Sequence, residues 1–274
     1  MHTPDPKLAF IGGGNMASAI IGGLIRQGTP AANITVVEPL AETAQQLRQQ
    51  WGLRVLSQPG PELQAAHCVV WAVKPQIFRE AAATVAPHVR AAMHLSVAAG
   101  IRTDSICGWL GSERLVRGMP NTPALLGQGM TALFACAAIS DVEKQLIEQI
   151  VATTGAFLWV EKESQLDAVT ALSGSGPAYV FYFLEAMTEA GARLGLSRQQ
   201  AYRLAVATFS GAASLAAASP ESPQVLRERV TSKGGTTHAA ITAMDKAQVK
   251  EAFIEAMQAA CTRASELGDE FGKP

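Results

Sequence analysis

The chain has 274 residues, of which 48% are hydrophobic and 16% are charged, and its formal net charge is -1. This length predicts two domains, and the low charged fraction indicates that contacts between subunits cover further apolar surface. A balanced charge without a Lys/Arg cluster argues against a nucleic acid or an anionic membrane as partner.

The four cysteines are far apart in the sequence and show no metal-ligand spacing. This pattern predicts reduced, mostly buried thiols in a cytoplasmic protein, and no metal site. No apolar run approaches the length of a membrane span, and the N-terminus has no pattern typical of a secretion signal. The cysteines are Cys68, Cys107, Cys136 and Cys261.

The first predicted element is a strand at residues 7–11, which leads into a glycine-rich turn and a helix rich in Ala and Ile. The turn reads Gly12-x-Gly14-x-x-Ala17, a spacing typical of dinucleotide-binding βαβ units. Gly12 permits the tight turn, Gly14 lets the backbone approach a pyrophosphate, and Ala17 allows close packing of the helix on the strand. A second strand at residues 33–38 follows at the distance that such a unit requires.

Six further strands are predicted, with helical stretches between several of them. This alternation predicts a mostly parallel, doubly wound α/β sheet. From about residue 164 the pattern changes to long helices without a convincing strand. We therefore expect a dinucleotide-binding domain at residues 1–163 and a helical domain at residues 164–274. The six strands lie at residues 53–56, 68–73, 94–99, 114–117, 130–134 and 157–160.

Glu38 stands at the end of the second predicted strand, where an acidic side chain bonds the ribose 2′-hydroxyl of NAD and repels the 2′-phosphate of NADP. No arginine follows within the next few residues, which favours NADH. Pro39 can instead turn Glu38 away from the site, and a solvent-facing glutamate is the alternative. The sequence leaves both interpretations, and the choice between NADH and NADPH, open.

Two loops follow the fourth and fifth strands, at the edge where ligands bind in open α/β sheets. The first loop contains Val73, Lys74 and Pro75, and the second ends at Gly100. Lys74 can be interpreted as a catalytic acid or a Schiff-base nucleophile. Because nothing in the sequence desolvates it, we expect a lysine that neutralises or packs along the dinucleotide.

A proline-bounded loop, Met119-Pro-Asn-Thr-Pro123, follows the sixth strand. The Asn121 amide can both donate and accept, which suits the nicotinamide carboxamide or the substrate, and a plain turn explains it as well. A helix with acidic residues at its start is predicted at residues 140–154.

The helical domain is predicted to begin with a Ser/Gly-rich approach at residues 172–176 and a helix with Pro177 at its first position. This helix is apolar nearly all round, and we infer that it is buried against a partner subunit. Ser197 is expected to cap the next helix, and a short helix follows at residues 224–230. The last helix has apolar residues at a spacing of three to four, which predicts one buried face. Those residues are Val249, Phe253, Met257, Cys261, Ala264 and Leu267.

The predicted centre of the chemistry is a glycine pair followed by a helix. Gly234 and Gly235 give the backbone unusual freedom, and the amphipathic run from Thr236 starts a helix, so that free N–H groups converge at its first turn. Such a turn binds an anion, and a carboxylate is the expected ligand. The hydroxyl groups of Ser232, Thr236 and Thr237 can donate or accept without carrying charge. A capped helix after a Gly-Gly turn is the simpler interpretation, and this segment alone leaves it open.

Five motifs follow one another in a fixed order along nearly the whole chain. They are Gly12-Gly-Gly-Asn-Met16, Ala72-Val-Lys-Pro75, Met119-Pro-Asn-Thr-Pro123, Leu172-Ser-Gly-Ser-Gly-Pro-Ala178 and Val230-Thr-Ser-Lys-Gly-Gly-Thr-Thr237. Together they resemble the Δ1-pyrroline-5-carboxylate reductase family, which catalyses the last step of proline biosynthesis. Five ordered motifs are far more specific than a single glycine-rich fingerprint.

The resemblance implies an N-terminal Rossmann-type domain and an all-helical dimerisation domain that interleaves with its copy in a homodimer, which some members build into a homodecamer. In that family the pocket for 1-pyrroline-5-carboxylate and L-proline lies between the cofactor domain and helical-domain residues, some from the neighbouring subunit. Lys233 occupies a position that varies in the family, and we give it no role.

The resemblance also assigns site residues by motif position. Residues 232–237 are expected to hold the substrate carboxylate, and Thr237 is expected to be catalytic by bonding the ring nitrogen. The expected substrate-binding residues are Ser175, Ser232, Gly234, Gly235, Thr236 and Thr237. The expected cofactor-binding residues are Gly12, Gly14, Asn15, Met16, Glu38, Ala72, Val73, Lys74, Pro75, Ala98, Gly100 and Asn121.

The implied reaction moves a hydride from NADPH or NADH to the C=N carbon of the cyclic imine, and the nitrogen ends up protonated. The free imine can take that proton from water, so positioning and an uncharged hydroxyl are enough. His238 is an alternative proton donor, but one helical step beyond Thr237 its side chain is expected to point elsewhere. His94 and Tyr179 are expected to be structural.

Two other functions are considered. A β-hydroxyacid or imine reductase shares this layout but uses a lysine on a helix of the second domain as its acid. Lys233 and Lys246 are the nearby candidates, and neither lies in such a motif. A non-catalytic nucleotide sensor keeps the fold but is expected to lose the substrate loop, which is intact here.

Overall fold

The computed structural model describes residues 6–272, and the chain forms two compact units. The sheet unit contains the chain up to Ser175 and again from Ala260, and the helical unit contains Gly176–Ala259. The chain returns to the sheet unit because the C-terminal part of the last helix packs there. The predicted domain ends at residues 1 and 274 lie outside the described residues.

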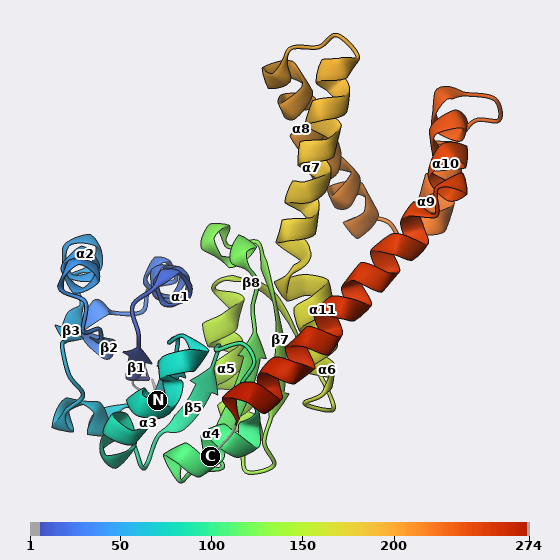
Figure 1. The fold of residues 1–274 in the computed structure, drawn as a ribbon. Helices are drawn as coiled ribbons and strands as arrows, with labels where there is room; N and C mark the ends of the chain where they lie inside the picture. The colour runs from blue at the N-terminus through green and yellow to red at the C-terminus, as the bar shows by residue number, and fades with distance from the viewer. Residues whose placement is uncertain (1–5, 273–274) are drawn as a thin grey trace. The chain divides into compact units, whose positions relative to one another are not determined.

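An eight-stranded sheet with the order β3-β2-β1-β4-β5-β6-β7-β8 forms the sheet unit (Figure 1). The strands from β3 to β6 are parallel, β7 is antiparallel to β6, and β8 is parallel to β7. Every predicted strand is present with its ends shifted by a few residues, and the predicted mostly parallel, doubly wound sheet is confirmed. The strands are β1 (Leu8–Ile11), β2 (Ile34–Val37), β3 (Arg54–Leu56), β4 (Cys68–Trp71), β5 (Met93–Ser96), β6 (Leu115–Met119), β7 (Gly129–Ala135) and β8 (Gly155–Trp159).

Helices cover both faces of this sheet because its central strands are apolar on both faces. Phe10 of β1 belongs to one core cluster together with Ile147 of α5, and Ile11 belongs to the other together with Phe78 of α3. Successive side chains of a strand point to opposite faces, so one run of four apolar residues feeds both cores. The helical segments of this unit are α1 (Asn15–Arg26), η1 (Ala31–Asn33), α2 (Ala41–Trp51), η2 (Pro61–Ala65), α3 (Pro75–Val85), η3 (Ala86–His88), α4 (Thr103–Leu110), η4 (Thr122–Leu126), α5 (Asp141–Ala152), α6 (Gln165–Val169) and the π-helical turn η5 (Thr170–Gly174).

The helical unit contains α7, α8, α9, α10 and the first part of α11, and no strand lies between Gly176 and Ala259. Ser197 caps α8 as predicted, since its hydroxyl accepts from the backbone N–H of Gln200 at 3.2 Å. Helices α7 and α8 approach closely at Gly191, where an added Cβ would lie 2.6 Å from the Cβ of Ala201. The bounds are α7 (Gly176–Arg193), α8 (Arg198–Ala217), α9 (Pro223–Arg229), α10 (Thr236–Lys246) and α11 (Val249–Phe271).

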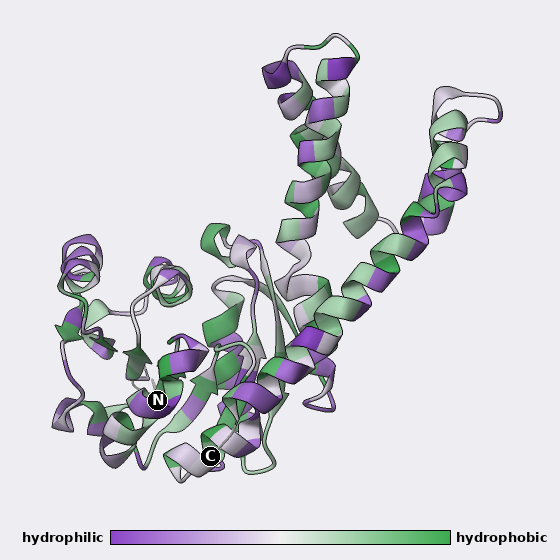
Figure 2. Ribbon diagram, viewed as in Figure 1, coloured by the Kyte–Doolittle hydropathy of each residue, from purple (hydrophilic) through white to green (hydrophobic). Residues whose placement is uncertain are grey.

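Many large apolar side chains of the helical unit are exposed. Phe181 is 59% exposed, Tyr182 is 69% exposed and Leu194 is 85% exposed. Figure 2 shows hydrophobic residues spread along α7, α8 and α10. Across residues 6–272, no helix is long and apolar enough to cross a membrane. Exposed apolar area on this scale marks a surface that another protein chain covers.

Three local predictions need correction. The approach at residues 172–176 is helical, because α6 continues through the π-helical turn η5 into α7, which begins at Gly176. The apolar stripe of α11 is only partly covered, and Val249 is 37% exposed, since its first half lies in the sparsely buried helical unit. The cysteines are free as predicted but only Cys68 is buried, and burial raises the pKa of its thiol to about 12.

Candidate active site

Gly12 and Gly14 of the glycine-rich turn between β1 and α1 have different surroundings. Gly12 has a φ of +91°, and a Cβ there would lie 2.7 Å from the carbonyl oxygen of Ala72. Gly14 is extended and caps α1, no side chain caps this helix start, and a Cβ there would meet nothing within 4 Å. The turn therefore leaves open space beside free N–H groups, which is what a pyrophosphate requires. Asn15 and Met16 form the first turn of α1.

Glu38 is turned toward this glycine-rich turn. Its side chain is 7% exposed, and Oε2 accepts from the backbone N–H of Gly13 at 2.8 Å while Oε1 accepts from that of Leu40 at 2.9 Å. The interpretation as a solvent-facing glutamate is therefore wrong, and Pro39 does not turn it away. Each carboxylate oxygen keeps a lone pair with which it can accept from a ribose hydroxyl.

The loop after β4 lies beside the glycine-rich turn at the carboxyl edge of the sheet. The backbone N–H of Ala72 donates to Ile11 at 2.9 Å, which holds this loop against the end of β1. Lys74 is the N-cap residue of α3, Pro75 is its first residue, and the Lys74 side chain is exposed. Exposure gives Lys74 no desolvated environment, so the Schiff-base interpretation finds no support in its surroundings.

The loop after β5 packs against the last helix. Ala98 is buried, and Gly100 has a φ of +70°. A Cβ at Gly100 would lie 3.1 Å from the Cβ of Leu267 and 3.4 Å from Cδ2 of Phe271. The end of α11 thus gives Gly100 a structural reason to be glycine, besides the cofactor contact that the sequence predicts.

Asn121 connects three segments of the sheet unit. Its Oδ1 accepts from the backbone N–H of Met130 at 2.9 Å, and its Nδ2 donates to Oγ of Ser173 at 3.1 Å. A plain turn is therefore an insufficient explanation for this residue. Ser173 lies in the π-helical turn before Ser175, and no role was predicted for it, although it belongs to the quoted Ser/Gly-rich motif.

The predicted substrate loop has one glycine with a positive φ. Gly234 has a φ of +77°, as predicted, whereas Gly235 has a φ of −81° and a ψ of 177°, an extended conformation open to any residue. Gly235 is instead the N-cap residue of α10, where no side chain caps the first turn, and its N–H donates to the carbonyl of Ser232 at 3.0 Å. Thr236 and Thr237 form the start of the helix, with Thr237 partly buried.

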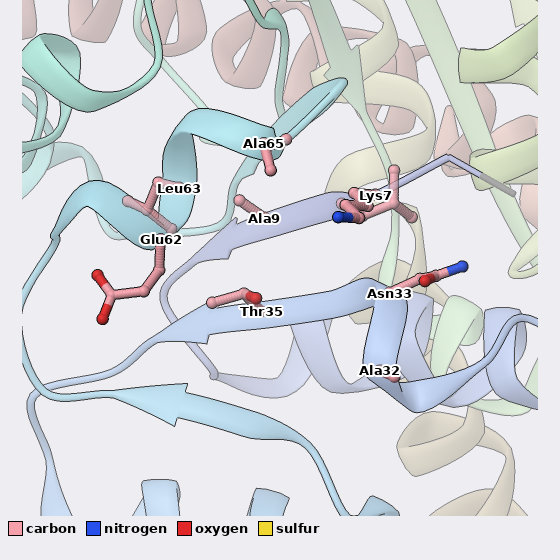
Figure 3. A pocket seen from close by; sticks show the side chains of 10 residues that line it. Lys7, Ala9, Ala32, Asn33, Thr35, Glu62, Leu63 and Ala65 are labelled. Carbon is pink, nitrogen blue, oxygen red and sulfur yellow. The ribbon is translucent and has the colours of Figure 1, made fainter. Parts of the chain in front are cut away.

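A small hollow lies away from these residues (Figure 3). Its lining includes Lys7 and Asn33 at the amino ends of β1 and β2, and Glu62 and Leu63 of η2. Because dinucleotides bind at the carboxyl ends of parallel strands, this hollow is not a candidate for the cofactor site. In the described part of the chain, no group of three or more His, Cys, Asp or Glu side chains could hold a metal ion.

Two family models match separate parts of the chain. The model for pyrroline-5-carboxylate reductase dimerisation matches residues 163–267. The model for coenzyme F420-dependent NADP oxidoreductases matches residues 7–100. The first match covers the helices with exposed apolar side chains, and the second covers the glycine-rich turn and the loops at the carboxyl edge.

Individual relatives match nearly the whole length. A pyrroline-5-carboxylate reductase of Pseudomonas aeruginosa is 44% identical over 271 residues, covering 98% of this chain and 99% of that protein. The structure of a pyrroline-5-carboxylate reductase from Coxiella burnetii is 37% identical with a TM-score of 0.90, covering 96% of this chain and 98% of that chain. The Plasmodium falciparum pyrroline carboxylate reductase, solved with NADP bound, is 28% identical with a TM-score of 0.84, covering 96% and 98%.

A dinucleotide-binding sheet followed by a helical dimerisation domain defines an NAD(P)H-dependent oxidoreductase that forms a homo-oligomer. The 44% identity with the Pseudomonas aeruginosa protein extends over nearly the full length of the chain, so this relationship accounts for both domains. The chain belongs to the pyrroline-5-carboxylate reductase family, which reduces 1-pyrroline-5-carboxylate to proline in the final step of proline biosynthesis. The predicted family, fold class, function and cofactor class are confirmed.

Proposed function

We propose that this chain reduces 1-pyrroline-5-carboxylate to L-proline with groups supplied by the turn before α10. The observation that carries the proposal is the start of this helix, where no side chain caps the first turn and Thr236 and Thr237 lie beside its free N–H groups. An uncapped helix start attracts a carboxylate, and this substrate carries one. NADPH or NADH, when bound, supplies the hydride.

Most of the proposed site residues bind the substrate, and one of them is catalytic. Ser232, Gly234, Gly235 and Thr236 hold the carboxylate, and Ser175 contacts the substrate. The Thr237 hydroxyl bonds the ring nitrogen, which fixes the C=N carbon for attack. A hydroxyl can donate to or accept from the nitrogen as it changes from imine to amine, and the proton itself comes from water.

The cofactor occupies the carboxyl edge of the sheet unit. The open space at Gly14 and the uncapped start of α1 fit a pyrophosphate. Glu38 accepts from the ribose, which favours NADH. The remaining cofactor contacts are proposed at Gly12, Asn15, Met16, Ala72, Val73, Lys74, Pro75, Ala98 and Gly100.

The protein is proposed to act in the cytoplasm as a homodimer at least, and a homodecamer is the larger alternative. Residues 1–163 are proposed as the dinucleotide-binding domain and residues 164–274 as the domain for dimerisation and substrate. The dimerisation model supports this boundary, since its match starts at residue 163.

The test is the loss of reduced-nicotinamide absorbance with 1-pyrroline-5-carboxylate, run with each cofactor. Thr237→Ala is expected to lower kcat by about ten- to a hundredfold, the scale of one lost transition-state hydrogen bond, with an unchanged Tm. Thr237→Ser keeps the hydroxyl and is expected to retain most of the activity. Wild-type turnover in Thr237→Ala would remove the role given to this residue, and no turnover by the wild type would remove the proposed function.

A further inference from the structure

A side-chain hydrogen bond joins the loop after β6 to the π-helical turn η5 within the sheet unit. Asn121 donates from Nδ2 to Oγ of Ser173 at 3.1 Å across 52 positions of the sequence. One residue further on, a Cβ at Gly174 would lie 2.5 Å from Cε of Met119, the last residue of β6. Two successive residues of η5 therefore lie against the end of β6 and the loop that follows it.

The π-helical turn is the unusual element of this pair. The backbone N–H of Ser175 donates to the carbonyl of Thr170 at 2.8 Å, five residues earlier, and the Thr170 hydroxyl donates to Leu166 at 2.7 Å. Such turns are rare, and they are frequently found at functional sites. Here the next residues are Ser175 and the start of α7.

The polar atoms of Asn121 are already engaged inside the protein. Oδ1 accepts from Met130, which ties the loop to β7, and Nδ2 reaches Ser173. The bridge therefore ties η5 to the loop after β6. The amide keeps one N–H and one oxygen lone pair, but its two bonds fix its orientation, and it is well placed to set the orientation of η5.

We propose that Asn121 is a positioning residue that acts through Ser173, holding η5 so that Ser175 faces the substrate. This inference rests on the proposed function, in which Ser175 contacts the substrate. It is an alternative to direct contact of Asn121 with the cofactor, which the sequence predicts.

The test is a double-mutant cycle of Asn121→Ala and Ser173→Ala. Each replacement removes one partner of the hydrogen bond, and the cycle separates this shared bond from the bond that Asn121 makes with Met130. Each single variant is expected to raise KM for 1-pyrroline-5-carboxylate about tenfold and to leave KM for the cofactor within about twofold. The double variant is expected to have a KM for 1-pyrroline-5-carboxylate no higher than that of the single variants. Ser164→Ala changes an exposed serine without a capping bond and is the matched control.

Two other results would overturn the proposal. A raised cofactor KM in Asn121→Ala, with Ser173→Ala unaffected, would mean direct contact with the nicotinamide. Additive effects in the double variant would mean that the two residues act independently.

A second measurement does not depend on turnover. Hydrogen exchange of the amides at residues 170–176 is expected to be at least about tenfold faster in both variants than in the wild type. Unchanged exchange would refute the positioning role even in an active enzyme. Faster exchange in a chain that reduces no pyrroline-5-carboxylate would support the positioning of η5 while the proposed function fails.

Discussion

Glu38 has a structural role, and we propose that it also selects the cofactor. Its carboxylate accepts from Gly13 and Leu40, and in the proposed cofactor site it would repel the 2′-phosphate of NADP. We expect Glu38→Ser to raise the ratio of kcat/KM with NADPH to kcat/KM with NADH by roughly tenfold, because the repulsion is lost. The nicotinamide absorbance assay with both cofactors measures this ratio.

Glu42→Ser is the matched control for Glu38→Ser. Glu42 lies in the first turn of α2 and is exposed, so its removal changes the net charge equally without opening the glycine-rich turn. The ratio is expected to stay constant in this variant. Equal shifts in both variants would assign the effect to net charge and not to the position of Glu38.

His94 makes folding stability depend on pH. It is 1% exposed and accepts from Nε1 of Trp71 through Nδ1 at 3.2 Å, and burial, helped by the charge of Arg114, lowers its pKa to about 4. As the pH falls below 6.5, the unfolded chain takes up this proton before the folded chain does. The stabilising contribution is thus complete above pH 6.5 and falls by about 3 kcal/mol as the pH approaches 4.

His94→Gln separates this effect from carboxylate titration, since glutamine offers an acceptor and does not ionise. Urea unfolding between pH 6.5 and 5 is expected to show a steeper loss of stability in the wild type than in the variant. Parallel pH profiles would show that His94 is not the titrating group.

At the scale of elements, one carboxylate joins three segments of the sheet unit. Oε1 of Glu163 lies 2.8 Å from Nη1 of Arg117 on β6, and the same side chain accepts from the backbone and hydroxyl of Thr103 at 2.7 and 2.6 Å. The Arg117 side chain is 4% exposed. Loss of the carboxylate charge therefore leaves the buried guanidinium of Arg117 without its oppositely charged partner.

We expect Glu163→Gln to lower the free energy of unfolding by roughly 3 kcal/mol, the usual cost of breaking a buried ion pair. Glu62→Gln, which breaks the exposed pair with Arg54, is expected to cost no more than about 0.5 kcal/mol. Urea unfolding measures both values. Equal losses would indicate that another group, such as nearby Asp167, neutralises Arg117.

The whole molecule depends on association, because the helical unit buries little of its own apolar surface. The buried residues of α7 and α8 are small, namely Gly191, Ala201 and Ala205, whereas Phe181 is 59% exposed. The match of this region to a dimerisation family explains the exposure. We expect Phe181→Glu to shift the protein toward monomers and to lower its activity with it, measured by light scattering after size-exclusion chromatography.

Val142→Glu is the control for Phe181→Glu. Val142 is 75% exposed in α5 of the sheet unit, outside the residues that match the dimerisation model. This variant is expected to keep the oligomeric state of the wild type. If both variants dissociate equally, or neither does, Phe181 has no special place in the interface.

Sequence patterns predicted the elements because their causes are local. The strand at β1, the turn at Gly12 and the capping of α8 by Ser197 each depend on residues within a few positions. The apolar surface of α7 likewise predicted a partner, since a helix without a polar face cannot face water. Predictions for single positions were less accurate. Gly235, for example, is extended, and its backbone angles do not require glycine.

Long-range pairs were decided by the tertiary structure alone. The bridge from Asn121 to Ser173, the turn of Glu38 toward Gly13 and the contact of Glu163 with Arg117 join residues that no local pattern relates. By itself the sequence determined the fold class, because periodicity and glycine spacing act locally, and the resemblance of five ordered motifs indicated the family. Which polar groups meet was left to packing, because a hydrogen bond depends on positions that only the folded chain brings within about 3 Å.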